Sequence, residues 1–281
     1  MPTPLGNLRD ISARALDALR DCDLLVAEDT RVARRLLNLY GIGGKQVWSY
    51  REQNAAGVTA PILERARTER VVVVSDAGMP GVSDPGRELI VAARLAGIPL
   101  EVLPGPVAFV TAAVLSGFPT TGLSFEGFVP RSASARRDAL DAALRRGAAS
   151  AWYESPNRIA ATLETLAQLA PEARVFIARE LTKLHEQQIL GTPAEALAAL
   201  ERPVRGEVVL VLEGTTERTQ PRGSEADAAD ALDLDAAIDA AFARGRSVAA
   251  TAKELAQAHG LARAEVYARA AARKRERGDR H

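Results

Sequence analysis

Cysteine and histidine are scarce in this chain of 281 residues, and each scarcity excludes a class of protein. The one cysteine, Cys22, cannot form an internal disulfide, which favours a cytoplasmic location. The three histidines form no recognisable zinc motif. The nearest match is HEQQI at 185–189, which has isoleucine where a metalloprotease helix needs its second histidine. We therefore expect no metal cofactor.

Long apolar runs and an excess of charge are also absent. No run reaches the roughly 18 residues of a membrane helix, so we expect no membrane partner. The start, MPTPLGNLRD, lacks the basic and apolar regions of a secretory signal. The formal net charge is zero, so total charge argues neither for nor against a nucleic-acid partner. Acids cluster between Arg222 and Arg244 and arginines cluster after Arg263, but both runs are also typical of solvated helix faces.

Short apolar runs alternate with amphipathic segments up to about residue 213, and this alternation predicts an α/β fold. Runs of valine and leucine indicate strands buried on both faces, as in parallel sheets. The predicted strands lie at 24–28, 46–50, 71–75, 100–103, 150–154, 174–179 and 207–214. The predicted helices between them lie at 30–41, 58–69, 87–96, 108–117, 134–146, 157–169 and 193–200.

Composition divides the chain further. Its length suggests about two α/β domains, and the stretch FPTTGLS, rich in turn-forming residues, is typical of a joint between them. We predict a first domain over 1–118, a second, smaller domain over 124–214, a linker over 215–232 and a helical segment over 233–281. Two short helical patterns joined by Gly260 resemble a helix-turn-helix, although small helical bundles give the same pattern.

Three loops rich in glycine and proline follow predicted strands or begin the chain, at 3–7, 75–81 and 104–106. Ligands of open α/β sheets bind beyond the carboxyl ends of the strands, so these loops predict a binding site. The chain has neither the GxxxxGK[ST] phosphate loop nor a GxGxxG dinucleotide loop. Because the loops carry Asp76 and Asp84, they suit a ligand with a positive charge or with hydroxyl groups that need acceptors.

A dense, ordered set of motifs supports a more specific interpretation. The motifs are TPLGNLRDIS (3–12), AEDTRVARRLLNLYGI (27–42), VSDAGMPGVSDPG (74–86), PGP (104–106), FEGFVPR (125–131), YESPNR (153–158) and ARELTKLHE (178–186). Through them, residues 3–214 closely resemble the ribosomal RNA small-subunit methyltransferase I family, which belongs to the tetrapyrrole methylase superfamily. The terminal helices resemble the helix-turn-helix appendage of many members.

The resemblance implies 2′-O-methylation of a cytidine ribose in the decoding region of 16S rRNA, with S-adenosylmethionine as cosubstrate. It implies two α/β domains with the cosubstrate cleft between them, a small C-terminal helical appendage and a homodimer. Whether the substrate is naked 16S rRNA or the small ribosomal subunit stays open. By the same resemblance, the residues that match the family's cosubstrate contacts are Leu5, Asp76, Ala77, Gly78, Val107, Ala108 and Glu154.

Two polar clusters that follow predicted strands are candidates for catalysis. Asp29 and Arg31 follow the first strand, and Glu180 and Lys183, with His185 nearby, follow the strand at 174–179. Either cluster could take the proton of a ribose hydroxyl or stabilise its alkoxide. The alternative is that Asp29 caps the next helix and that Glu180 and Lys183 form a surface ion pair.

A basic stretch beside the predicted domain joint is the candidate RNA contact. Arg131, Arg136 and Arg137 are the first candidates for binding phosphate, and Arg263 belongs to a second patch near the C-terminus. Arg145 and Arg146 are equally well explained as part of an exposed, charged helix.

One departure from the family concerns the N-terminus. Members have a hydrophobic strand before TPLGN, whereas this chain has only Met1 and Pro2. Since a missing strand would leave backbone groups unpaired, we expect the natural protein to start upstream.

Three other functions remain open at this stage. The same fold could methylate a corrin precursor or act in diphthine formation, or the chain could be an RNA-binding relative without catalysis.

Overall fold

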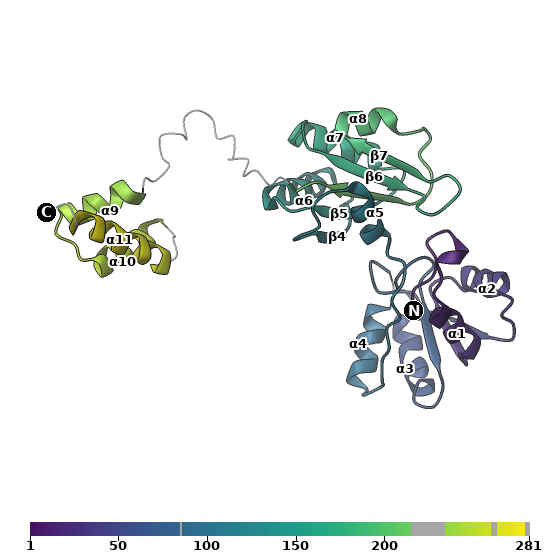
Figure 1. Ribbon diagram of the computed structural model, residues 1–281. Helices are drawn as coiled ribbons and strands as arrows, with labels where there is room; N and C mark the ends of the chain where they lie inside the picture. The colour runs from purple at the N-terminus through teal and green to yellow at the C-terminus, as the bar shows by residue number, and fades with distance from the viewer. Residues whose placement is uncertain (85, 215–233, 260–262, 279–281) are drawn as a thin grey trace. The chain divides into compact units, whose positions relative to one another are not determined.

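The computed structural model of the chain describes residues 1–84, 86–214, 234–259 and 263–278. The chain divides into two compact units, Met1–Arg218 and Thr219–His281. The first unit holds two β-sheets and the second holds three helices (Figure 1). The predicted linker, 215–232, lies outside the described residues. Among the residues that are described, no helix is long and apolar enough to cross a membrane.

The first sheet has three parallel strands in the order β2-β1-β3. They are β1 (Leu24–Ala27), β2 (Gln46–Ser49) and β3 (Val71–Val74). The helices of this part are η1 (Leu8–Asp10), α1 (Ala13–Asp21), α2 (Thr30–Leu39), α3 (Ala55–Arg65) and α4 (Arg87–Leu95). Every residue of β1 is buried, because apolar clusters cover both faces of the sheet.

The second sheet has five strands in the order β4-β5-β8-β6-β7. They are β4 (Ser124–Phe128), β5 (Ser150–Glu154), β6 (Val175–Arg179), β7 (Gln187–Gly191) and β8 (Val208–Leu212). Strands β4 and β5 are parallel, whereas every pairing of β8 and β7 is antiparallel. The helices are α5 (Ala108–Ser116), α6 (Ala133–Arg146), α7 (Ile159–Leu169) and α8 (Pro193–Ala199).

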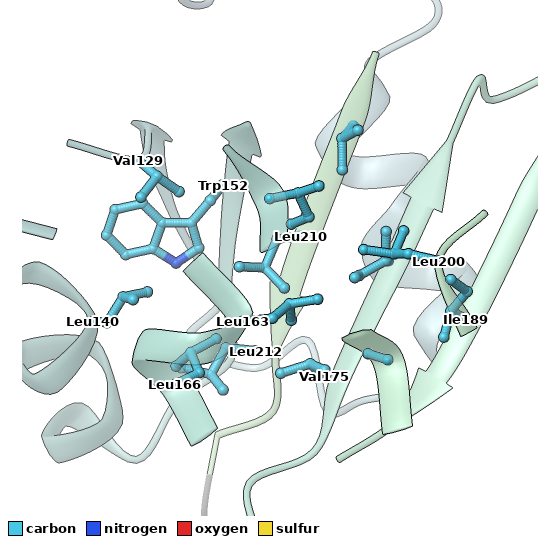
Figure 2. Packing of buried hydrophobic residues seen from close by; sticks show 14 of the residues in the cluster. Val129, Leu140, Trp152, Leu163, Leu166, Val175, Ile189, Leu200, Leu210 and Leu212 are labelled. Atoms are coloured by element: carbon cyan, nitrogen blue, oxygen red, sulfur yellow. The ribbon is translucent and has the colours of Figure 1, made fainter. Parts of the chain in front are cut away.

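The core of this part follows from the alternation of side chains along β8. Leu210 and Leu212 pack into a cluster with residues of α6, α7 and α8, while Val209 and Val211 pack on the opposite face with α5. Figure 2 shows the first cluster, in which the indole ring of Trp152 lies beside Val129. Leu5, from the N-terminal loop, joins the cluster on the α5 face, so residues before the first sheet pack against the second sheet.

The α/β fold class predicted from the sequence is confirmed, but strands β4 and β7 were not predicted and two details are wrong. Residues 100–103 form no strand, because the free edge of β3 is contacted by the N-terminal residues instead. The Met1 ammonium donates to the Val73 carbonyl oxygen at 2.7 Å, and Val102 is exposed. The second sheet is mixed rather than parallel, since β8 runs antiparallel between β5 and β6.

The second unit is a small helical bundle. Its helices are α9 (Leu234–Ala243), α10 (Val248–His259) and α11 (Arg263–Gly278), all within the helical segment predicted over 233–281. Ile238, Leu255 and Val266 bring one side chain from each helix into a buried core. Asp239 and Arg273 join α9 to α11 by an ion pair of 2.7 Å.

Candidate functional site

Two of the three loops that were predicted to bind a ligand, 3–7 and 75–81, line one cavity of about 290 Å³ in the first compact unit, and the residues just after the third loop, Val107 and Ala108, line it too. The lining combines the N-terminal loop, the loop after β3, the start of α5, and the carboxyl end of β5 with the amino end of β8. Of the residues predicted to contact the cosubstrate, those that line it are Leu5, Ala77, Gly78, Val107, Ala108 and Glu154. The remaining one, Asp76, lines a neighbouring open cleft of about 800 Å³.

Backbone hydrogen bonds hold the loop after β3 against the N-terminal loop. The N–H of Thr3 donates to the carbonyl oxygen of Gly78 at 2.9 Å, and the Gly78 N–H donates back at 3.1 Å. The Ser75 hydroxyl also donates to the Gly78 carbonyl oxygen, at 3.1 Å. Gly78 has φ +75°, and a Cβ there would lie 3.2 Å from the Leu5 side chain. Glycine is therefore required by both conformation and space at this wall of the cavity.

Glu154 lines the cavity, but its carboxylate does not face a ligand there. Its carboxylate is fully buried and accepts hydrogen bonds from the Ser155 N–H at 2.6 Å and the Thr162 hydroxyl at 2.7 Å. It also forms an ion pair with Arg158. Because these contacts occupy the carboxylate, only the main chain of Glu154 is available to a ligand.

Asp29 acts as a helix cap and as the centre of an arginine cluster. Its carboxylate accepts from the Arg31 N–H at 2.8 Å, which caps α2, and from the Arg31 guanidinium at 2.6 Å. Arg51 lies 3.6 Å away from the same carboxylate. The hydrogen bonds from Arg31 lower the pKa of Asp29 well below its usual range. Asp29 is therefore poorly suited to accept a proton, and the capping alternative describes its geometry.

Other carboxyl groups around the two cavities have raised pKa values, in contrast to Asp29. Burial, together with the charge of Glu28, raises the pKa of Asp84 to about 6, and Asp84 lines the smaller cavity. Burial, with Asp76 second, raises the pKa of Glu28, and burial also raises that of Asp76. The Asp29 N–H donates to an Asp76 carboxylate oxygen at 3.1 Å, within the lining of the larger cleft. Crowded carboxylates of this kind attract a cation, and their pKa values rise because burial and the neighbouring negative charges disfavour the ionised form.

The second predicted catalytic pair forms a network of three charged groups. The Lys183 ammonium lies 2.8 Å from a Glu180 carboxylate oxygen and 3.0 Å from one of Glu207. The Glu207 N–H donates to the same Glu180 oxygen at 3.0 Å. Gly206 has φ +81°, and a Cβ there would lie 2.2 Å from the Glu180 carboxylate. Glu207 also lines the cavity, so the network borders the candidate site.

The protonation states of this network follow from its contacts. Burial would lower the pKa of Lys183, but its hydrogen bonds to the Glu180 and Glu207 carboxylates outweigh burial and raise that pKa. Burial would raise the pKa of Glu180, but the Lys183 ammonium and the Glu207 N–H outweigh it and lower that pKa. Lys183 therefore stays protonated within the network. His185 is exposed, and no described residue hydrogen-bonds to it.

The N-terminal loop fixes this network in place. A Cβ on Gly6 would lie 2.2 Å from the Lys183 side chain, and the Asn7 N–H donates to the Thr182 hydroxyl at 3.0 Å. The cavity wall and the charged network are therefore parts of one packed arrangement.

The predicted RNA-binding arginines differ in how far they are already engaged. Arg131 and Arg137 are exposed, and neither pairs with any residue that the structure describes. Arg136 is half-buried and donates to the Thr165 hydroxyl at 3.2 Å. Arg145 pairs with Asp141, and Arg146 pairs with Glu126, as the charged-helix alternative predicts. The side chain of Arg263 lies outside the described residues.

Glu207, Tyr153 and Phe128 are among the lining residues that sequence reasoning missed. Glu207 stands directly before the apolar run VVLVL, and an acid at the end of a buried strand is the signal that could have identified it. Burial raises the pKa of Tyr153 to about 12, so its hydroxyl stays protonated.

Comparison with known proteins gives consistent results. The family model of the Tetrapyrrole (Corrin/Porphyrin) Methylases matches residues 2–198. Ribosomal RNA small subunit methyltransferase I of Thermotoga maritima is 41% identical over 215 residues, which cover 75% of this chain and 96% of that protein. The protein of the same name from Synechocystis sp. is 36% identical over 268 residues, or 94% of each chain.

Solved structures share the fold at much lower identity. Diphthine synthase superposes with a TM-score of 0.60 at 17% identity, over 75% of this chain and 87% of that chain. Uroporphyrin-III C-methyl transferase from Thermus thermophilus, complexed with S-adenyl homocysteine, superposes with a TM-score of 0.52 at 19% identity, over 75% of this chain and 94% of that chain.

Proposed function

The chain belongs to the tetrapyrrole methylases and, within them, to the ribosomal RNA small subunit methyltransferase I family, and from that membership we propose that it methylates the 2′-oxygen of a cytidine ribose in 16S rRNA. Methyl transfer from S-adenosylmethionine to rRNA is the activity of this family. The identity of the nucleotide, the position of the methylated oxygen and the roles of the residues go beyond this shared activity and are proposed here. The observation that carries them is a single cavity bordered by both the predicted donor loops and the Glu180–Lys183–Glu207 network.

The shape and charge of the cavity fit the donor. When bound, the donor supplies an electrophilic methyl group on a positively charged sulfonium. Gly78 lets the backbone approach closely because no side chain fits there. Asp84 and the adjacent Asp76 favour a positively charged ligand. Leu5, Val107 and Ala108 supply apolar surface that excludes water from the reacting atoms.

Asp84 is the carboxyl best suited to accept the proton of the ribose hydroxyl. General bases work best with a pKa near the working pH, and its pKa is raised to about 6. Asp29 and Glu180 are weaker bases, because their pKa values are lowered. Lys183 stays protonated, so its role in the proposal is to stabilise negative charge on the acceptor oxygen and to hold Glu207.

The exposed arginines support a polymeric substrate. Within the described part of the chain, Arg131 and Arg137 have no partner, and a guanidinium group can bind a phosphate in bidentate fashion. A path of phosphate-binding cations favours RNA over a protein side chain as the substrate. The fold alone cannot decide between these substrates, because diphthine synthase and uroporphyrin methyltransferase share it. We propose that the small ribosomal subunit, rather than naked rRNA, is the substrate.

An apolar surface supports the proposed homodimer. Helix α5 is apolar on nearly all sides, yet Val110, Val114 and Leu115 on it are exposed. Val102, just before this helix, is 69% exposed. A helix that is apolar all round is normally covered, and a second copy of the chain would cover this one.

The experiment that tests the proposal uses small ribosomal subunits that lack the modification. The full chain is incubated with these subunits, or with naked 16S rRNA, and S-adenosylmethionine labelled in its methyl group. The label should appear on one cytidine and should survive alkaline hydrolysis as a resistant dinucleotide, because a 2′-O-methyl group blocks cleavage at that position. Label on a base, or no label on RNA, would contradict the proposal.

A further inference from the structure

Phe128 is a large aromatic side chain that borders the cavity but does not fill it. It is 56% exposed, whereas the neighbouring Phe125 is stacked on Phe109 with ring centroids 4.2 Å apart. Its ring meets Tyr153 edge-on, at 5.6 Å between centroids and 67° between planes. One edge of the Phe128 ring is therefore held by Tyr153 while much of its surface stays accessible.

A β-bulge determines the direction of this ring. In the pairing of β4 with β5, Phe125 is opposite Ala151 and Phe128 is opposite Tyr153, so β4 holds one residue more than β5. Without the extra residue, side chains three apart would point to opposite faces. With it, Phe125 and Phe128 both contact the ring of Tyr153. Bulges next to active sites often re-aim a side chain in this way.

Gly127 and Val129 stabilise the bulge on its two sides. Gly127 has φ +71°, which favours glycine, and a Cβ there would lie 3.6 Å from the Ser83 hydroxyl oxygen of the loop after β3. Val129 is 1% exposed and anchored in the opposite core, where its N–H donates to the Tyr153 carbonyl oxygen at 3.0 Å. Because Val129 is fixed on one face, the preceding Phe128 is directed to the cavity side.

The chain that follows Phe128 carries the cations that RNA requires. Arg131 is three residues further on, and three residues span at most about 11 Å. Arg137 follows within α6, and both guanidinium groups are free of partners among the described residues. An exposed ring beside unpaired arginines is the combination by which proteins bind single-stranded RNA, with bases stacked on the ring and phosphates on the cations.

We propose that the ring of Phe128, presented by the bulge at Glu126–Gly127, is the platform on which the base of the target nucleotide stacks while its ribose enters the candidate site. This inference rests on the proposed function and specifies how that site holds its RNA. A nucleotide whose ribose enters the cavity leaves its stack, and a preformed aromatic surface compensates for the lost stacking.

The test compares Phe128→Leu with Phe128→Tyr in the full chain. Two quantities are measured: kcat/KM for small ribosomal subunits that lack the modification, and the Kd for S-adenosylhomocysteine by calorimetry. Leu190→Ala is the matched control, because Leu190 is similarly exposed on β7, at the other edge of the same sheet. Thermal midpoints establish that each variant is folded.

The leucine variant should lose about 5- to 150-fold in kcat/KM, the range expected for one base–aromatic stack. The tyrosine variant should stay near wild type, since it keeps the ring, and neither variant should bind S-adenosylhomocysteine more weakly. An unchanged kcat/KM in the leucine variant would overturn the proposal. A matching loss of S-adenosylhomocysteine affinity would also overturn it, by assigning the ring to the adenine of the donor.

A second measurement uses the wild-type chain and an RNA fragment with a fluorescent cytosine analogue at the target position. Stacking on Phe128 should quench the fluorescence, and Phe128→Leu should remove the quenching. Quenching that survives in the leucine variant would count against the platform. If the wild-type chain transfers no methyl group to any RNA, the proposed function fails. If the wild-type chain is active and the leucine variant is equally active, only the stacking proposal fails.

Discussion

Replacing Gly206 with alanine should disrupt the charged network beside the cavity without removing any charged group. A Cβ at this position would lie 2.2 Å from a Glu180 carboxylate oxygen and 2.3 Å from the carboxyl carbon. The carboxylate must therefore move, which breaks its bonds to the Lys183 ammonium at 2.8 Å and to the Glu207 N–H at 3.0 Å.

The expected loss of stability has two parts. Alanine at φ +81° costs about 1 kcal/mol through backbone strain alone. Each hydrogen bond to a charged group contributes about 1.5–3 kcal/mol when buried, and we halve this because Glu180 and Lys183 are partly exposed, at 21% and 30% of their side chains. The sum is about 2–4 kcal/mol, which lowers the melting temperature by about 5–15 °C in a unit of this size.

Gly44→Ala is the matched control for this variant. Gly44 has φ +74°, but no atom lies within 4 Å of the position where its Cβ would be. It should therefore show the strain of about 1 kcal/mol and no more. Calorimetric melting of both variants, with methyl transfer measured well below both midpoints, separates strain from displacement of Glu180. Equal melting temperatures and equal rates in the two variants would refute the inferred position of the Glu180 carboxylate.

Three further predictions concern the proposed roles of charged residues. Lys183→Met should lower kcat by about 10²–10⁴-fold while calorimetry still detects S-adenosylhomocysteine binding, and near-normal turnover would remove this cation from the mechanism. The wild-type rate should fall as pH drops through about 6, because the Asp84 carboxylate becomes protonated there. This decrease at low pH should be absent in Asp84→Asn. A wild-type rate that is constant down to pH 5 would exclude Asp84 as the base. Arg137→Gln should reduce the slope of log affinity against log salt for RNA by about 1, whereas Arg145→Gln, whose arginine already pairs with Asp141, should change it little; identical slopes would contradict the phosphate path.

Local patterns in the sequence predicted the strands and the loops of the site well. The four valines of β3 and the loop after them form a strand and a cavity wall, because an apolar run with a glycine- and proline-rich end has few other stable arrangements. The loop residues found together in the cavity were identified by their resemblance to a family rather than by the patterns themselves.

Pairings between distant segments could not be predicted in the same way. An apolar run such as VVLVL shows that a strand is buried but not which strands lie beside it, so the antiparallel insertion of β8 was missed. The run at 100–103 also satisfies the pattern of a strand, yet no described residue pairs with it. For Glu154, sequence places the residue at the site but cannot show that its carboxylate turns inward to Thr162.

Two site residues depended on contacts that no short motif contains. Glu207 bonds to Lys183 across 24 positions of the chain, and such a distant pair leaves no local signal. Phe128 was overlooked within FEGF, although a glycine inside a strand pattern is itself a sign of a bulge.

The central position of β8 has a consequence for how the protein is made. This strand lies in the middle of the second sheet, yet it is the last strand of that sheet to leave the ribosome during synthesis. Until it emerges, β5 and β6 have no partner between them, and the cavity lacks the wall formed by Glu207, Val208 and Val209. A nascent chain that stops before residue 207 should therefore expose an open pair of strand edges and be unable to bind the methyl donor, so the enzyme becomes competent only when nearly all of its first compact unit has been translated.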